Sequence, residues 1–189
     1  VEWSKGLVTA KGVGVANRHA PTAAAARGPA RRAADDAAKK QLAAELPSLP
    51  LAEGGTLAAK LKDPAIKGRV DRAIEAALVV DADLSTDGSW KVTLGVPLEA
   101  IRLAIAGPRA APKSDTDGPA ILVVDGATAK PAIGYKLGKH AAATLWVTDV
   151  PAWAKDAPRV KAKSAKSGVI ELDDAKGTES TLFVIVVPR

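Results

Sequence analysis

Two stretches near the start of the chain show clear periodicities. In residues 6–16 larger side chains alternate with small ones, which predicts a strand whose glycines, Gly12 and Gly14, let another backbone come close. Residues 22–46 then change to alanine, arginine, aspartate, lysine and glutamine, all of which favour a helix. We expect one long helix capped by Thr22, with Gly28 and Pro29 disturbing its first turns.

Alanines recur at helical spacing along this second stretch and predict a stripe of small side chains that lets the helix lie close to a sheet. The stripe consists of Ala30, Ala33, Ala34, Ala37 and Ala38 and continues to Leu42 and Leu46. Because close packing leaves no spare room, we expect Ala34→Leu to overpack the interface by about 1 to 3 kcal/mol. Arg31 is expected on the solvent side, where Arg31→Ala should cost less than about 0.5 kcal/mol.

The clearest turn signal follows a shorter helical region at residues 56–76 that Pro64 interrupts. Asp87-Gly88 is a favoured turn between two alternating runs, and it predicts a hairpin over residues 76–96. Trp90, Val92 and Leu94 share one face of that hairpin and should lie under the long helix. An amphipathic segment then opens at Pro97.

Residues 107–119 are rich in proline, glycine, serine and aspartate, as linkers often are. We therefore expect a first domain over residues 1–106, a linker over 107–119, and a mostly β subdomain over 120–189 that packs on the first or stands apart. Four apolar runs in the last part read as strands, with a short turn or helix near residues 151–155. The predicted fold class is α+β, with a long helix packed on an antiparallel sheet followed by a mostly β C-terminal part.

Composition agrees with an ordinary globular protein, since 47% of the 189 residues are hydrophobic and 25% are charged. The net charge of +6 is a modest excess, and its densest runs, around residues 27–40 and 159–166, lack the interleaved aromatic side chains of single-strand binders. We interpret these runs as solvated surface, so nucleic acid is an unlikely partner. The alternative left open is a module that binds an anionic ligand such as acidic polysaccharide, lipid headgroup or nucleic acid.

The chain contains no cysteine, which excludes disulfides, thiolate metal sites and cysteine nucleophiles. No apolar run reaches the roughly 18 residues that a membrane span needs. The sequence begins at Val1 and has no methionine, and we interpret it as a processed or trimmed product.

Candidate catalytic patterns are weak. His19 and His140 are the only histidines, so we expect no metal site, and Gly12-Val13-Gly14 lacks the third glycine of a dinucleotide fingerprint. No serine lies in a nucleophile elbow. We expect no enzymatic activity and no cofactor.

Candidate interaction residues come from two groups, the aromatic residues favoured at recognition surfaces and the second basic run. For the aromatic residues, core packing is the favoured reading and an interaction role is the alternative. The candidates are Trp146, Trp153, Tyr135, Arg159, Lys161 and Lys163.

Several short segments occur in an order that resembles a family of bacterial outer-membrane surface lipoproteins typified by a twenty-kilodalton member. That family is also similar to the N-terminal domain of a flagellar outer-membrane-ring assembly protein. The matching segments are A-K-G-V-G at 10–14, A-R-R-A-A at 30–34, A-A-L-V-V at 76–80, G-S-W-K-V-T-L-G-V-P-L at 88–98, L-V-V-D at 122–125 and K-P-A at 130–132. The chain departs from the family where relatives carry an Asp-Ala and an aromatic residue before the helix leucine, because Ala37 and Lys39 stand there.

The resemblance implies an exported cell-envelope protein, periplasmic or associated with the outer membrane, with a structural or interaction role and no enzymatic activity. It implies protein partners in the envelope. Membrane association would go through an N-terminal lipid anchor that has been removed, because the chain has no cysteine to carry a lipid.

Overall fold

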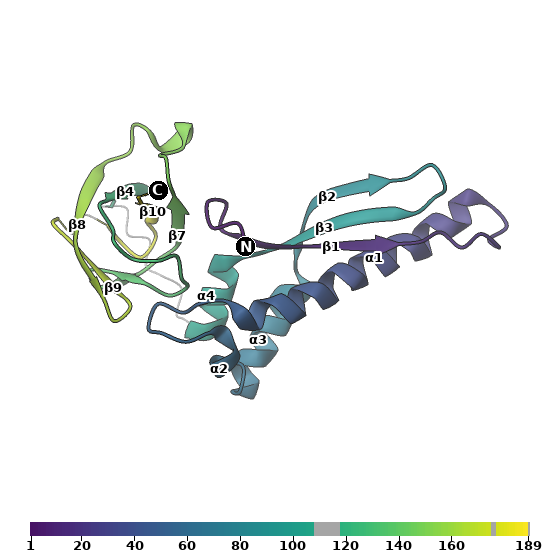
Figure 1. Ribbon diagram of the computed structural model, residues 1–189, viewed down its shortest axis with the longest axis horizontal. Helices are drawn as coiled ribbons and strands as arrows, with labels where there is room; N and C mark the ends of the chain where they lie inside the picture. Colours follow the sequence, from purple (N-terminus) through teal and green to yellow (C-terminus); the bar gives the residue numbers. More distant parts are fainter. Residues whose placement is uncertain (108–117, 175–176, 189) are drawn as a thin grey trace.

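The computed structural model describes residues 1–107, 118–174 and 177–188. Two β-sheets lie at opposite ends of an elongated molecule, and short helices fill the region between them (Figure 1). One sheet carries the long helix and the other lies in a mostly β C-terminal part. The α+β fold expected from the sequence is therefore confirmed.

The first sheet has three antiparallel strands in the order β1-β3-β2. Its strands are β1 (Leu7–Gly14), β2 (Leu78–Leu84) and β3 (Trp90–Pro97). The hairpin turn forms at Asp87-Gly88 as predicted, where Gly88 adopts a φ of 86° and the Asp87 carboxylate accepts hydrogen bonds from the Ser89 amide and hydroxyl. These bonds lower the pKa of Asp87 below its ordinary value.

Helix α1 (Ala23–Glu45) runs beneath β1 and β3 (Figure 1). The Thr22 hydroxyl accepts a hydrogen bond from the Ala25 amide, so the predicted N-cap is confirmed. Pro29 lies inside the helix, which continues through it, and a 3-10 turn, η1 (Leu46–Ser48), follows. The buried positions of α1 are four residues apart and are Ala26, Ala30, Ala34, Ala38 and Leu42.

The strand glycines allow the close approach that the sequence predicts. A Cβ built on Gly12 would lie only 1.9 Å from the Ala34 carbonyl oxygen, and one on Gly14 would lie 1.8 Å from the Ala30 carbonyl oxygen. Helix backbone thus rests directly on strand backbone. Any side chain at these two positions of β1 would push the elements apart.

Two details of the predicted helix face are wrong. Ala33 and Ala37 are exposed, because the buried row follows a strict four-residue spacing and leaves the neighbouring alanines in solvent. Arg31 is half-buried, not on a purely wet side, because its guanidinium lies 4.8 Å from the centre of the Trp90 ring and its Nε donates a 3.1 Å hydrogen bond to Asp35. Its aliphatic stem therefore covers the hairpin.

Three short helices close the end of this sheet nearest the second one: α2 (Leu57–Lys60), α3 (Pro64–Glu75) and α4 (Leu98–Ala106). The break at Pro64 and the helical segment after Pro97 are as predicted. The Asp63 carboxylate caps α3 by accepting bonds from the Ala65 and Ile66 amides. Leu57, Val70 and Ile101 are buried with Val92 and Leu94 of β3 in one hydrophobic core.

The C-terminal part forms a seven-stranded mixed sheet in the order β6-β5-β9-β8-β4-β10-β7. The four predicted strands are present, and β10 lies between β4 and β7, parallel to both. The basic run at 159–166, expected as solvated surface, is strand β8, and the predicted turn at 151–155 holds the 3-10 helix η2 (Ala152–Ala154). The strands are β4 (Ile121–Asp125), β5 (Lys136–Leu137), β6 (His140–Ala141), β7 (Thr144–Val147), β8 (Arg159–Lys166), β9 (Val169–Leu172) and β10 (Leu182–Val186).

The two sheets are tied together at points far apart in the sequence. Leu51 forms a bridge with Ile133, and the Ala52 amide donates a 2.9 Å bond to the Ile133 carbonyl. A second link involves Trp3, near the N-terminus. Its carbonyl accepts a 3.2 Å hydrogen bond from the Trp146 amide, and its side chain packs against the cores of both parts. Most of the expected linker, residues 108–117, lies outside the described residues, so the division into domains stays a prediction.

Candidate functional site

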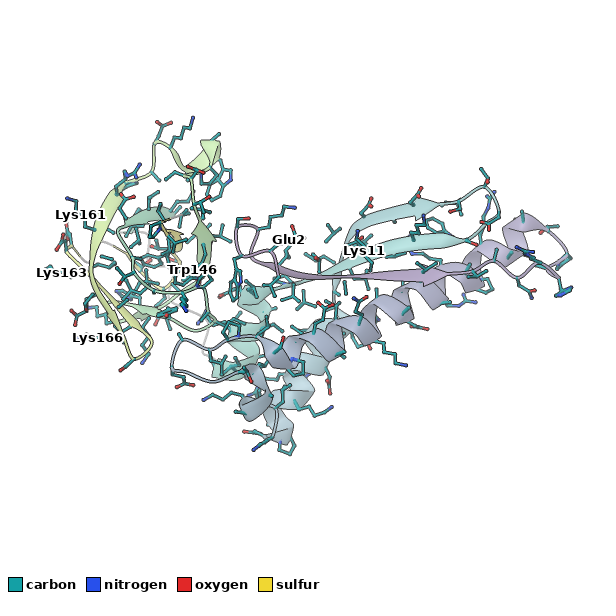
Figure 2. The ribbon with its side chains drawn as sticks, viewed as in Figure 1. Glu2, Lys11, Trp146, Lys161, Lys163 and Lys166 are labelled. Atoms are coloured by element: carbon teal, nitrogen blue, oxygen red, sulfur yellow. The ribbon has the colours of Figure 1, made fainter. Side chains whose placement is uncertain are left out.

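Two of the candidate aromatic residues are packed against each other inside the second sheet unit. Trp146, labelled in Figure 2, is only 3% exposed. Its ring centre lies 5.3 Å from that of Tyr135, and the two rings make an interplanar angle of 58°. Burial raises the pKa of Tyr135 above its ordinary value. Trp146 therefore contributes to packing, the reading that the sequence favoured, whereas Trp153 in η2 is 55% exposed.

The basic candidates lie together on strand β8 and point to solvent, where Figure 2 places Lys161 and Lys163 on the outer side of the sheet. Arg159 donates two hydrogen bonds, of 2.8 and 2.6 Å, to the Asp125 carboxylate, and this pairing raises the pKa of Arg159. Lys163 pairs with Asp173 at 3.4 Å. These acidic partners reduce the net positive charge of the strand, which weakens it as a docking surface for polyanions.

Strand β2, the first strand of the predicted hairpin, has an exposure that the sequence analysis did not anticipate. It is the free edge of the first sheet, and every one of its residues is exposed. Leu78 and Val79 are each 55% exposed, and Val80 and Leu84 are also exposed. The sequence predicts a hairpin strand here, but α1 covers β1 and β3 and leaves β2 open, which only the placement of the helix reveals.

The two faces of β2 differ in chemistry. Asp81 and Asp83 are in register with Thr93 and Lys91 of β3, so they lie on the face that points away from α1. A bulge at Val80 interrupts the register, and the Val80 side chain lies over Gly95, where a Cβ would come within 2.8 Å of it. The edge therefore presents aliphatic side chains and two carboxylates to any strand laid against it.

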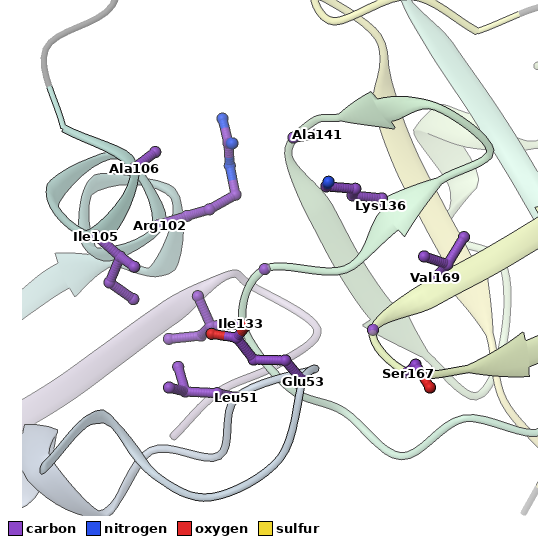
Figure 3. Close-up of a pocket in the computed structure, with 12 residues that line it drawn as sticks. Leu51, Glu53, Arg102, Ile105, Ala106, Ile133, Lys136, Ala141, Ser167 and Val169 are labelled. Atoms are coloured by element: carbon purple, nitrogen blue, oxygen red, sulfur yellow. The ribbon is translucent and has the colours of Figure 1, made fainter. Parts of the chain in front are cut away.

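A cleft of about 260 Å³ lies between the two sheet units (Figure 3). One wall comes from α4 and the loop after η1, and the other comes from β5, β6 and the turn between β8 and β9. Figure 3 shows the side chains of Arg102 and Lys136 extending into it from opposite walls. The lining residues are Leu51, Glu53, Arg102, Ile105, Ala106, Ile133, Gly134, Lys136, Ala141, Ser167, Gly168 and Val169.

The charged groups of one wall are already paired. Arg102 is nearly buried and donates two bonds, of 2.7 and 2.6 Å, to the Glu99 carboxylate, which holds its guanidinium in place. Glu53 pairs with Lys60 at 2.5 Å. Lys136, on the opposite wall, makes no salt bridge with any residue in the described part of the chain.

Neither a metal centre nor a membrane-spanning helix is found within residues 1–107, 118–174 and 177–188. No group of three histidine or acidic side chains there could hold a metal ion. None of the helices described in those ranges combines the length and the hydrophobicity that crossing a membrane requires. The chain matches no protein-family model, and no curated protein matches it.

Proposed function

We propose that the protein is an interaction module of the bacterial cell envelope that is exported, has no enzymatic activity, and binds protein partners through the free edge of β2. The family resemblance supports the envelope location. The observation that carries the interaction role is the edge itself, a strand of Leu78–Leu84 with four exposed aliphatic side chains. Such an edge offers unpaired backbone donors and acceptors to an incoming strand.

The acidic residues of β2 favour a partner with basic residues over a second copy of this chain. In an antiparallel pair of two β2 strands, residues on one face lie opposite residues on the same face, so Asp81 and Asp83 would meet the same carboxylates of the copy. Like charges in that position destabilise pairing. A partner segment that alternates aliphatic and basic side chains would match both the aliphatic and the acidic positions.

The edge can be tested with two blocked peptides as long as β2, one alternating lysine with valine and the other alternating glutamate with valine. Titration is followed by the backbone amide resonances of the protein. We expect the lysine peptide to shift resonances of β2 and β3 and to bind about tenfold more tightly than the glutamate peptide, since two cross-strand charge pairs change sign. This difference should shrink as salt screens the charges.

Charge reversal supplies the matched variant. Asp81→Lys with Asp83→Asn places no lysine opposite Lys91 of β3 and should invert the preference, so that the glutamate peptide binds more tightly. As a control, Asp71→Lys on the exposed surface of α3 should leave the preference unchanged. Equal binding of both peptides, or resonance shifts confined to the second sheet, would contradict the proposed edge.

The envelope location needs a separate test. We expect the full-length protein, expressed in its own bacterium, to fractionate with the periplasm or the outer membrane. Recovery in the cytoplasm would refute the envelope assignment without bearing on the edge of β2.

A further inference from the structure

The cleft between the two sheet units has a chemistry of its own, separate from the edge of β2. Its floor is aliphatic, formed by Leu51 and Ile133 where the two units bridge, and Ile105 and Val169 add aliphatic surface to the two walls. Leu51 and Ile133 are themselves buried. The volume of about 260 Å³ corresponds to about nine water molecules at about 30 Å³ each, which is room for a small organic molecule.

The electrostatics of the cleft favour an anion. Glu53 and Arg102 each have an opposite charge bound to them, so each contributes a neutral pair. Lys136 adds a positive charge at the mouth, opposite the Arg102 guanidinium (Figure 3). An acid group placed between these two side chains would gain attraction from Lys136 and hydrogen bonds from guanidinium N–H groups that Glu99 does not occupy.

We propose that this cleft binds a small amphipathic carboxylate, with its aliphatic part on the floor of Leu51 and Ile133 and its acid group between Lys136 and Arg102. Binding then bridges the two sheet units, since the two cations come from opposite sides of the interface. A ligand that touches both walls stabilises their docking by mass action.

A series of three eight-carbon probes tests the charge and the apolar requirement separately: octanoate, octanol and octylamine. Binding is measured by titration of the protein's backbone amide resonances. We expect octanoate to bind with a Kd of about 1 mM or lower and to shift resonances on both walls of the cleft, and octanol to bind at least about fivefold more weakly. Octylamine should bind more weakly still, because its ammonium would face Lys136.

Two pairs of variants locate the site. Lys136→Glu should weaken octanoate binding about tenfold, whereas Lys139→Glu, an exposed position in the turn of the same hairpin that does not line the cleft, should leave it within about twofold. Ala106→Trp should fill the exposed end of the cleft and abolish binding. Leu103→Trp, on the same helix but away from the cleft, should not.

Circular dichroism of each variant verifies that it is folded, and the Lys136 and Lys139 pair stays informative even if a tryptophan variant unfolds, because both lysines are exposed. The inference is overturned if octanoate shifts no resonances on either wall, if octylamine binds as tightly as octanoate, or if Lys136→Glu and Lys139→Glu have equal effects. Neither the peptide preference of β2 nor cell fractionation bears on these outcomes.

Discussion

The contact between α1 and β1 makes Gly12→Ala a severe substitution, although it adds only one methyl group. The new Cβ would lie 1.9 Å from the Ala34 carbonyl oxygen and 2.6 Å from the Ala38 amide nitrogen. A carbon and an oxygen come no closer than about 3.3 Å, so the helix has to retreat by more than about 1 Å. The obstructing atoms are backbone, and therefore no side-chain rotation relieves the clash.

When α1 moves away from β1, the contact between the helix and the sheet is loosened along its length. A gap of about 0.5 to 1 Å already loses a quarter to a half of the dispersion energy between the atoms that face it. Ala30, Ala34, Ala38 and Leu42 all face the sheet from one side of the helix. We expect Gly12→Ala to lower the free energy of unfolding by about 3 kcal/mol, at the upper end of the usual range for overpacking.

Urea unfolding followed by far-ultraviolet circular dichroism measures this loss. With a slope of about 2 kcal/mol/M, the midpoint should fall by about 1.5 M. The control is Gly68→Ala, because Gly68 lies inside α3 and nothing beyond its chain neighbours and its own helix backbone lies within 4 Å of a Cβ there. That substitution should raise stability by about 0.5 to 1 kcal/mol. If Gly12→Ala and Gly68→Ala gave the same midpoint, the backbone contact between helix and strand would be wrong.

Other substitutions probe the same helix and the second core. Ala34→Leu should cost about 1 to 3 kcal/mol in urea unfolding, because Ala34 is fully buried against β1, and a cost below about 0.5 kcal/mol would argue against that packing. Arg31→Ala should cost about 0.5 to 1 kcal/mol through loss of its contact with Trp90, and Trp90→Leu should remove most of that difference in a double-mutant cycle. Burial raises the pKa of Tyr135 above 10.0, so the stabilisation linked to its neutral form is complete below pH 10 and is lost as pH rises through the folded-state pKa. Tyr135→Phe should remove this alkaline loss in melts across pH 9 to 12, and an unchanged loss would assign it to another group.

Local patterns predicted most of the elements but not how they cover one another. The Thr22 cap and the Asp87-Gly88 turn act through backbone within a few residues, so the sequence alone identifies them, and the two β1 glycines indicate by their lack of a side chain that another backbone comes close. The exposure of β2 depends on where α1 lies across the sheet, which the residues of β2 do not themselves specify. Strand β8 was missed because its charged residues hid an alternation in which Val160 alone is buried.

The cleft could not be predicted, because its walls come from segments far apart in the sequence. Arg102 and Lys136 carry no shared motif, and only the docking of the two sheet units brings them to one opening. Trp146 shows that residue type alone also does not decide between a binding role and a packing role. Composition singles out a tryptophan as an anchor residue for binding, but its neighbours in space decide that it packs in a core.

The order of strands in the first sheet also constrains how the chain can fold during synthesis. The first strand to be made, β1, has β3 as its only neighbour in that sheet, with Leu7 opposite Pro97. Until β3 has been synthesised, β1 has no strand to pair with, and the alanine face of α1 has no complete sheet to cover. Such distant pairing slows folding and leaves an unpaired strand exposed in the nascent chain. The hairpin of β2 and β3, closed by its own turn, can form early and serve as the template on which β1 and then α1 assemble.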